Sequence, residues 1–448
     1  MMKNSSNAAH RPDSLAGIVA AFEGISNGYT MLNCPIGCKI PLGYTSNVLS
    51  SHFTPVDSLS FADFYFGQNR LPCTFTDEQD FVYGAEEKIR QVVQLLDSKR
   101  YGLIGVINHS GTALIGDDLF RIIQASAVKT RTMVVDSSGF TGTYADGFKT
   151  GVIKILERLA KKPNVTVPCS VNLIGPTVFH YNWKNDVHEL KRMLRVLGID
   201  TVSVICAGET ICNLDRVGEA ALNLVVYEEY GDSIAYFLKK EYGTPSIGLD
   251  MSAPFGLGAS EAWFTAVSDF FHLSPKPVVL ASKHVRMKCY PELSRLSNLN
   301  NTLQGVPFAV FGDSSQLAPL VAFLHEYLGM YPAVVGIREV GSYSYDSLKK
   351  YLSTNSLETL VMVNPDQYEI IDALNEHVPP LVFGSDIEAH LSMMLAELPV
   401  FIPVSFPLYE HVLLTRCPLL GFNGVLTIVE SIINSFKRYQ LTKNDFLP

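Results

Sequence analysis

Three cysteines near the start of the chain have the side chains and surroundings that could ligate a soft metal. Cys34 and Cys38 lie in TMLNCPIGCKIPLGY, which is dense in proline and glycine and predicts a turn, and Cys73 lies in NRLPCTFTDE, just before a predicted helix. Thiolates at helix N-termini and in irregular loops have lowered pKa values and suit soft metals. The spacing C-x3-C is not the usual zinc spacing, and no His-x3–5-His pair follows. Iron–sulfur ligation and unliganded loop cysteines therefore both stay open on spacing alone.

The other five cysteines carry a weaker signal. Cys212 falls in a loop-like segment, and the remaining four lie in or beside apolar runs, where we expect small buried side chains: Cys169, Cys206, Cys289 and Cys417. The N-terminal residues MMKNSSNAAHRPDS lack the apolar core of a signal peptide, and no apolar stretch is long enough to span a membrane. We therefore expect a cytoplasmic protein whose cysteines are thiols or metal ligands, with no membrane partner.

The composition indicates a large, well-buried chain. It has 448 residues, of which 47% are hydrophobic and 18% are charged, below the roughly 25% of an average soluble domain. The low charged fraction suggests surface hidden by a partner subunit or by parallel strands buried on both faces. The balance of 35 basic against 44 acidic residues gives a net charge of −9, so nucleic acid is not expected as a main partner.

The elements that must position these cysteines alternate between short apolar runs and amphipathic stretches. Strands are predicted at 101–108, 130–138, 167–175, 200–208, 222–227, 277–282, 307–313, 332–337, 359–364, 381–386 and 400–407. Helical patterns such as ADGFKTGVIKILERLAKK lie between them, which is typical of an α/β fold with parallel sheets flanked by helices. These strands are too many for one ordinary doubly wound sheet. We therefore predict three Rossmann-like domains, over residues 1–168, 169–300 and 301–448.

The strand-to-helix turns of such a fold should line its functional clefts, because open α/β sheets bind ligands beyond the carboxyl ends of their strands. FGDSSQ (311–316) is one such turn: Gly312 permits the tight turn, and Asp313 or Ser314 can cap the helix that follows.

Several segments in order resemble the nitrogenase component 1 type oxidoreductases, and the β chain more than the α chain. LNCPIGC resembles the family's cluster loop H-G-x-x-G-C, with Cys38 at its cysteine, and LIGVINHSGTALIGDDL resembles the segment that ends in I-G-D-D. GFTGTYADGF resembles F-V-G-S-x-x-x-G-W, and FAVFGDSSQ resembles the third-domain A-x-Y-G-D-P-D. The resemblance spans essentially the whole chain.

The resemblance implies a cluster at a subunit interface, with Cys38 as a ligand. Of the three β-chain cluster cysteines, only the position of Cys38 is kept: the first aligns near Pro12 and the third falls on Ser110. The cluster is then a 4Fe–4S or P-cluster-like group to which this chain gives Cys38, with Cys34 and Cys73 as further candidates. Alternatively, Ser110 or a carboxylate such as Asp13 gives the cluster an oxygen ligand in place of a missing cysteine.

The resemblance also implies what the chain does. Tyr227 stands where an α chain carries its cofactor-anchoring cysteine, so the active site is expected in an α-like partner within an α2β2 complex. Electrons would come from an iron protein that alone uses ATP and magnesium, docking over residues 144–148 and the helix after Cys73. Reduction of a methylthio-alkane or a tetrapyrrole is favoured over dinitrogen. The alternative function is a non-catalytic scaffold for assembling a metal cofactor.

Overall fold

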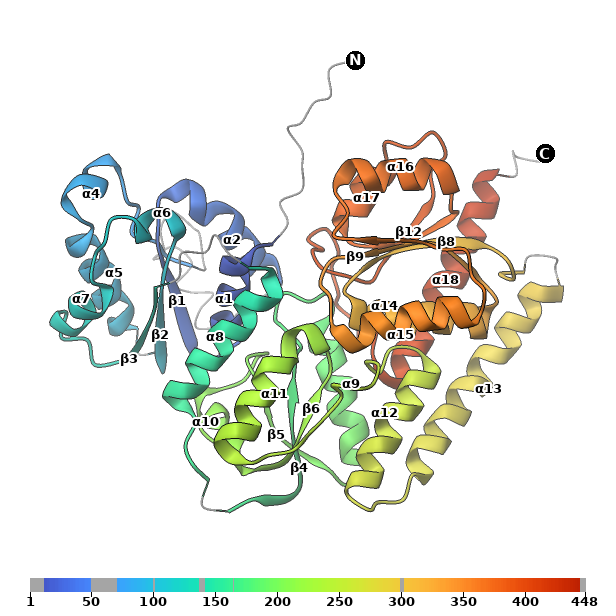
Figure 1. The fold of residues 1–448 in the computed structure, drawn as a ribbon, viewed down its shortest axis with the longest axis horizontal. Coiled ribbons are helices and arrows are strands. Elements are labelled where there is room, and N and C mark those ends of the chain that lie inside the picture. Colours follow the sequence, from blue (N-terminus) through green and yellow to red (C-terminus); the bar gives the residue numbers. More distant parts are fainter. Residues whose placement is uncertain are drawn as a thin grey trace.

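The computed structural model describes residues 12–49, 71–99, 101–136, 142–163, 165–298 and 302–443. Three separate parallel sheets follow one another along the chain, each flanked by helices (Figure 1). The predicted α/β class with three mainly parallel sheets is confirmed. The three predicted domain boundaries remain predictions. Among the described residues, no helix is both long and apolar enough for a membrane span.

The first sheet has the order β1-β2-β3, with all pairs parallel and Asn33, Asn108 and Asp136 in register at its carboxyl edge. Its strands are β1 (Gly28–Asn33), β2 (Leu103–Asn108) and β3 (Arg131–Asp136), and its helices are α1 (Ser14–Glu23), α2 (Ile36–Leu49), α4 (Glu78–Tyr83), α5 (Glu86–Ser98), α6 (Ser110–Ala113) and α7 (Leu119–Ala125). β1 and β2 are buried along their whole length, as parallel strands covered on both faces must be.

The second sheet has the order β5-β4-β6-β7. Its elements are α8 (Tyr144–Leu159), β4 (Val167–Ile174), α9 (Trp183–Val196), β5 (Asp200–Val204), α10 (Ile211–Leu214), the 3-10 helix η2 (Val217–Glu219), β6 (Ala220–Val225), α11 (Glu228–Tyr242), β7 (Ser246–Ile247), α12 (Leu257–Phe270) and α13 (Lys276–Asn298). α12 and α13 form a long helical pair beside this sheet (Figure 1).

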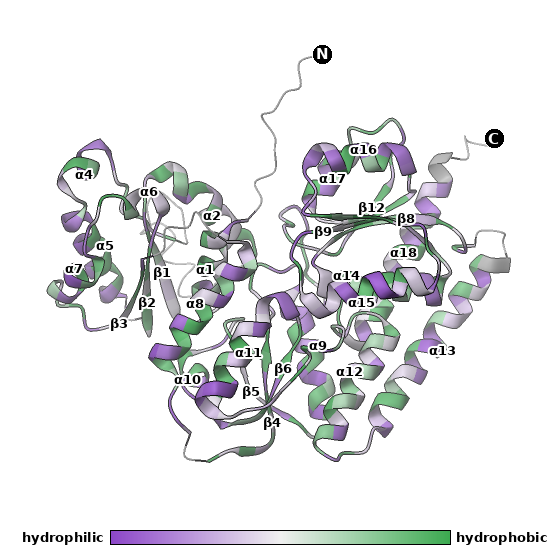
Figure 2. Ribbon diagram, in the orientation of Figure 1, coloured by the Kyte–Doolittle hydropathy of each residue, from purple (hydrophilic) through white to green (hydrophobic). Residues whose placement is uncertain are grey.

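The third sheet has the order β10-β9-β8-β11-β12. Its elements are β8 (Pro307–Gly312), α14 (Ser314–Leu328), β9 (Tyr331–Ile337), α15 (Ser342–Thr354), β10 (Leu360–Val363), α16 (Gln367–His377), β11 (Leu381–Gly384), α17 (Asp386–Ser392), β12 (Val400–Pro403) and α18 (Gly421–Lys443). α15 buries Ser344, Leu348 and Leu352 at four-residue spacing and turns a hydrophilic face outward (Figure 2). α18 packs back on α9, α12 and α13, so the last described helix lies against the second unit.

One predicted strand is wrong. PVVLAS (277–282) is the first part of helix α13, in which Val279 and Leu280 are exposed. A six-residue apolar run cannot by itself be told from a helix segment, and the proline sits in the first turn, where a helix tolerates it. Two strands were missed, β1 and the two-residue β7.

The first and second units are joined by the crossing of α1 and α8, in which glycines replace side chains. A Cβ at Gly17 would lie 2.0 Å from the carbonyl oxygen of Tyr144, and one at Gly147 would lie 1.8 Å from the carbonyl oxygen of Ser14. The N-cap of α1, Asp13, also forms an isolated antiparallel bridge with Thr143, the N-cap of α8. The two backbones therefore touch directly, and no larger residue fits between them.

We predict that Gly147→Ala destabilises the protein by about 2–3 kcal/mol, because the helices must separate to admit the methyl group. The measurement is the urea midpoint of the purified chain. Gly258→Ala in α12 is the matched control, since a Cβ there meets no atom within 4 Å and alanine favours a helix. A Gly147→Ala midpoint equal to that of the control would contradict the close-contact argument.

Candidate functional site

Backbone pairing brings Cys73 beside Cys34, which lies 39 residues earlier in the chain. Residues 71–76 run next to the end of β1, where Leu32 and Cys73 form an isolated parallel bridge. The Leu32 amide donates to the Pro72 carbonyl at 2.9 Å, and the Thr74 amide donates to the Leu32 carbonyl at 3.1 Å. Cys34 directly follows β1, so both thiols lie at the carboxyl edge of the first sheet.

The three candidate cysteines interact with one another and differ in exposure. Cys34 and Cys73 are fully buried, whereas Cys38 is partly exposed. The Cys34 thiol hydrogen-bonds to Cys73, and this bond together with burial raises the pKa of Cys34. The same bond, a backbone hydrogen bond at Phe75 and the charge of Lys39 hold the pKa of Cys73 below its usual value, against the effect of burial. Burial and the negative charge on Cys73 raise the pKa of Cys38. The structure thus gathers all three predicted cysteines at one place.

The proline- and glycine-rich sequence predicted a turn around Cys38, and this prediction is wrong. Cys38 lies in the first turn of helix α2, which begins at Ile36 directly after Pro35 and continues through Pro41. Proline fits at the start of a helix because the amide groups there have no intrahelical partner. The amides of Cys38 and Lys39 donate to the Pro35 carbonyl at 3.2 and 3.3 Å.

Lys39 is a site residue that the sequence reasoning missed. Its side chain is almost fully buried, burial lowers its pKa, and negative charge on Cys73 and Cys34 raises it. Burying a charged lysine costs free energy unless a negative charge balances it. A thiolate of Cys73 or Cys34 would supply that negative charge, and the ammonium group in turn favours the thiolate. The only signal in the sequence was a basic residue next to Cys38.

A row of polar side chains runs across the carboxyl edge of the first sheet and ends at Cys34. Asn108 donates to Asp136 at 2.9 Å, Asn33 donates to Asn108 at 3.0 Å, and Thr74 donates to Asn33 at 2.8 Å. The Cys34 amide donates to the Thr74 hydroxyl at 3.1 Å. Buried polar groups bonded in series fix one another's positions, so this row sets the place of the cysteine backbone.

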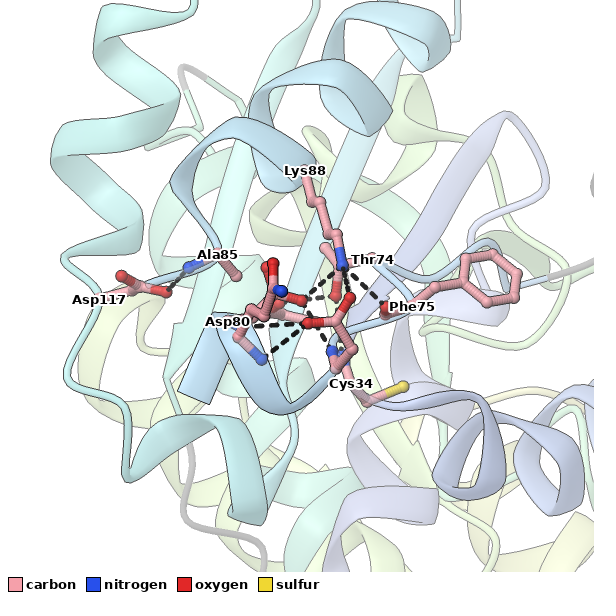
Figure 3. A network of polar contacts seen from close by, with 10 residues as sticks. Cys34, Thr74, Phe75, Asp80, Ala85, Lys88 and Asp117 are labelled. Carbon is pink, nitrogen blue, oxygen red and sulfur yellow. Dashed lines mark hydrogen bonds and ion pairs between the residues drawn. The ribbon is translucent and has the colours of Figure 1, made fainter. Parts of the chain in front are cut away.

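A second network fixes the segment that carries Cys73 (Figure 3). Lys88 of α5 donates to the Phe75 carbonyl at 3.2 Å and pairs with Asp77 at 2.8 Å and Asp80 at 2.6 Å. Asp77 and Asp80 also form the capping box of α4, and nearby the amide of Ala85 donates to Asp117 at 2.8 Å. One lysine therefore ties residues 75–80 to α5.

One candidate oxygen ligand follows the neighbouring strand β2, and the other caps helix α1. Ser110 is buried and begins α6 directly after β2, and the His109 amide donates to the Asn33 carbonyl at 3.1 Å. Asp13 is exposed, caps α1 through the Ala16 amide at 2.9 Å, and its charge partly offsets the burial that lowers the pKa of His109. Ser110 therefore lies at the edge of the sheet that carries the thiols, and Asp13 is linked to that edge through its interaction with His109.

The donor set fits an iron–sulfur group in its chemistry, because it offers three thiols with a lysine ammonium beside them. The described residues do not by themselves form a complete set of metal ligands. Within the described part of the chain, no three His, Cys, Asp or Glu side chains converge where one metal ion could be held. The arrangement can supply a few ligands to a cluster completed from outside the chain.

The remaining cysteines lie apart from this site in the sequence and in the fold. Cys206 and Cys289 are buried, as predicted, but Cys169 and Cys417 are partly exposed and Cys212 is exposed. Cys289 lies in helix α13 rather than beside a strand.

The expectation that residues 144–148 form a docking surface is wrong. Tyr144, Ala145, Gly147 and Phe148 are buried where α8 begins, and only Asp146 is exposed. The segment packs against α1 and lines a cavity instead. The other expected docking element, α4, exposes Val82 and Tyr83.

Tyr227 is buried before α11, and burial raises the pKa of its phenol well above the usual value. Its hydroxyl hydrogen-bonds to Gln316 of α14, so it links the second and third units.

Comparison with known proteins gives a consistent family. The family model described as nitrogenase component 1 type oxidoreductase matches residues 14–437. A light-independent protochlorophyllide reductase subunit from Chloroflexus aurantiacus is 25% identical over 338 residues, covering 74% of this chain and 61% of the relative. The corresponding reductase subunit from Chlorobium phaeobacteroides is 27% identical over 451 residues, covering 95% and 78%. The chain thus spans about three fifths of the length of the Chloroflexus relative.

Solved structures agree on the fold. The structure of "Nitrogenase Cp1 at pH 6.5" superposes with a TM-score of 0.79 at 18% identity, covering 100% of this chain and 96% of the other. At this identity, the likeness shows the fold alone.

We predict that Lys88→Met loosens the segment that holds Cys73 and destabilises the protein by about 1–2 kcal/mol, because Asp80 loses its partner. Amide hydrogen exchange in residues 71–85 should become faster while exchange in the third unit stays unchanged. Arg295→Met is the control, since its pair with Glu292 is exposed and should contribute less than about 1 kcal/mol. Unchanged exchange in residues 71–85 would show that Lys88 does not hold the segment.

Proposed function

The chain belongs to the nitrogenase component 1 type oxidoreductase family, and we propose that it is the β-like subunit of a nitrogenase-like reductase. In this proposal it relays electrons through an interface iron–sulfur cluster to an active site in an α-like partner. The observation that carries the proposal is the gathering of three cysteines at one sheet edge in a chain matched to the family over residues 14–437.

Cys38 is the proposed principal ligand of the cluster. It is the least buried of the three thiols, and it matches the family's cluster cysteine, so a cluster shared with another chain could reach it. Cys73, with its lowered pKa, and Cys34 are further candidates, and Ser110 or Asp13 is the oxygen alternative. When bound, a 4Fe–4S or P-cluster-like group supplies one-electron transfer. The buried Lys39 adds positive charge that favours thiolate over thiol.

The proposed substrate class is a tetrapyrrole, in preference to a methylthio-alkane or dinitrogen. Support comes from the relatives, which are named as subunits of light-independent protochlorophyllide reductase and reach 27% identity over 95% of this chain. The missing β-chain cysteines, at Pro12 and Ser110, point in the same direction, away from a nitrogenase proper.

The proposed partners are an α-like chain, in an α2β2 complex, and an iron protein that uses ATP and magnesium. Helix α2, which carries Cys38, exposes apolar side chains at four-residue spacing: Ile36 is 42%, Ile40 53% and Tyr44 55% exposed. An exposed apolar row is costly in water and typical of a subunit interface. For the iron protein we retain the exposed end of α4 as the docking element.

We predict that Cys38→Ala lowers the iron content of the anaerobically purified complex and changes its electron paramagnetic resonance signal. A missing thiolate leaves one iron open to solvent, which weakens cluster retention. Reductase turnover should fall with the iron content.

Cys212→Ala is the matched control, because it removes an exposed thiol far along the sequence and should keep iron, signal and turnover. Full iron, an unaltered signal and full turnover in Cys38→Ala would mean that Cys38 is not a ligand. Turnover also separates the two functions: a complex that passes its cluster to an apo-protein and reduces no tetrapyrrole is the scaffold.

We predict that Ile40→Asp weakens assembly with the α-like chain more than tenfold, because a charge replaces an apolar contact at the interface. Sedimentation velocity of the co-expressed chains measures the loss of the heterocomplex. Val165→Asp, at an exposed valine beside the second sheet, should assemble normally. If both variants assembled equally well, α2 would not be part of the interface with the α-like chain.

A further inference from the structure

A cavity of about 390 Å³ lies where the three units meet, and none of the three candidate cysteines lines it. Its walls come from the start of α8, the start of α11 and the turns after β8 and β9. These are carboxyl ends of strands and first turns of helices, the places at which α/β folds bind ligands. The volume is in the range of small-molecule pockets.

The cavity is lined by more acids than bases, and its bases are already paired. Arg338 pairs with the fully buried Glu388 and donates to Ser385, and Lys149 lies 3.2 Å from Asp232 and 3.5 Å from Asp146. Three lining carboxyls, Glu229, Asp313 and Glu339, have no lysine or arginine in ion-pair contact among the described residues.

One of these carboxyls has a buried oxygen without a hydrogen-bond donor. Glu229 is 3% exposed, and its Oε1 accepts from the Ser314 hydroxyl and the Ser315 amide. Its Oε2 has no partner within the described part of the chain. Nε2 of His180, 3.9 Å from Asp313, is also unpartnered, but Nδ1 of that ring accepts from the Thr177 amide, so Nε2 is a donor and does not add to the missing donors. A buried carboxylate oxygen without a donor is costly, so the cavity lacks a donor that a ligand would bring.

The helix N-termini around the cavity are already occupied by the protein's own acids, which disfavours an anionic ligand. Glu339 accepts from the Ala145 amide at the start of α8, Glu229 accepts at the start of α14, and Glu228 accepts from the Tyr343 and Ser344 amides of α15. Asp313, one of the two residues that the sequence offered as a cap, stands at the N-cap position of α14, but its side chain makes no capping hydrogen bond. It accepts from the Tyr230 hydroxyl at 2.8 Å instead.

A metal ion is also disfavoured, since no three acidic, histidine or cysteine side chains of the described chain converge on one point. The rest of the wall is apolar and aromatic, with Tyr144 and Phe406 at 5.2 Å between ring centroids and Val340 and Ile387 beside them. Aromatic faces and carboxylates together suit a positively charged organic group.

We propose that this cavity binds a small organic cation, whose ammonium group donates to Glu229 and Asp313. The proposal does not rest on the iron–sulfur function, so either proposal can fail without the other.

Burial raises the pKa of both Glu229 and Asp313 to about 7, and that of Glu339 above its usual value. The ammonium requires the ionised carboxylates, so its affinity should rise with pH through about 7, with protons released on binding. The titratable and charged groups around this pair are Tyr144, Asp146, Lys149, His180, Tyr227, Tyr230, Arg338 and Glu339. Burial lowers the pKa of His180 to about 3, so this ring adds no competing cation.

Isothermal titration calorimetry of the full chain with 1,4-diaminobutane at pH 8 tests the proposal. We expect saturable one-to-one binding that the neutral isostere 1,4-butanediol does not show, weakened at least about tenfold in Glu229→Gln and in Asp313→Asn. Glu376→Gln, at an exposed acid of α16, is the matched control and should bind like the unaltered chain. The comparison of diamine with diol needs no variant, so a misfolded variant does not block the test.

Two results would overturn the proposal. One is the absence of saturable diamine binding by the folded chain, or binding that both cavity variants leave unchanged. The other is tight binding of Mg²⁺ that the same variants abolish, which would make the cavity a metal site.

Discussion

The direct contact between helices α1 and α8 is the constraint on which both sites depend. Gly17 and Gly147 let the two backbones touch, and this contact sets the first sheet against the second. The N-terminus of α1 places Asp13 beside His109, at the flank of the thiol site. The N-terminus of α8 forms a wall of the cavity lined by Glu229 and Asp313. A shift between these helices would therefore displace residues of both sites at once.

The thiol site combines burial with positive charge. Burial disfavours deprotonation of Cys34 and Cys38, whereas the Cys34 hydrogen bond and Lys39 favour the thiolate of Cys73. Binding of a metal group to thiols requires their deprotonation, so such binding must overcome the cost of burial. The polar row from Asp136 to Thr74 and the pairs of Lys88 hold the two cysteine segments in place independently of any metal.

Much of the fold could be predicted because parallel strands buried on both faces give apolar runs, and most of those runs are strands. The strand predicted at 277–282 is wrong because an apolar stretch of that length is also compatible with a helix, and α13 continues well beyond it. Cys34, Cys38 and Cys73 could be picked out by residue type and resemblance. Their exposure could not, because it depends on pairing between β1 and residues 71–76. The same holds for residues 144–148, whose burial follows from a helix crossing that no local pattern encodes.

The central claim is that Cys38 gives its thiolate to a cluster shared between two chains. A high-resolution cryo-electron microscopy map of the anaerobically purified complex tests it most directly. The account predicts cluster density at the carboxyl edge of the first sheet, continuous with the Cys38 sulfur and facing the α-like chain. A cluster bonded wholly by residues of the partner, with Cys38 turned away from it, would contradict the account.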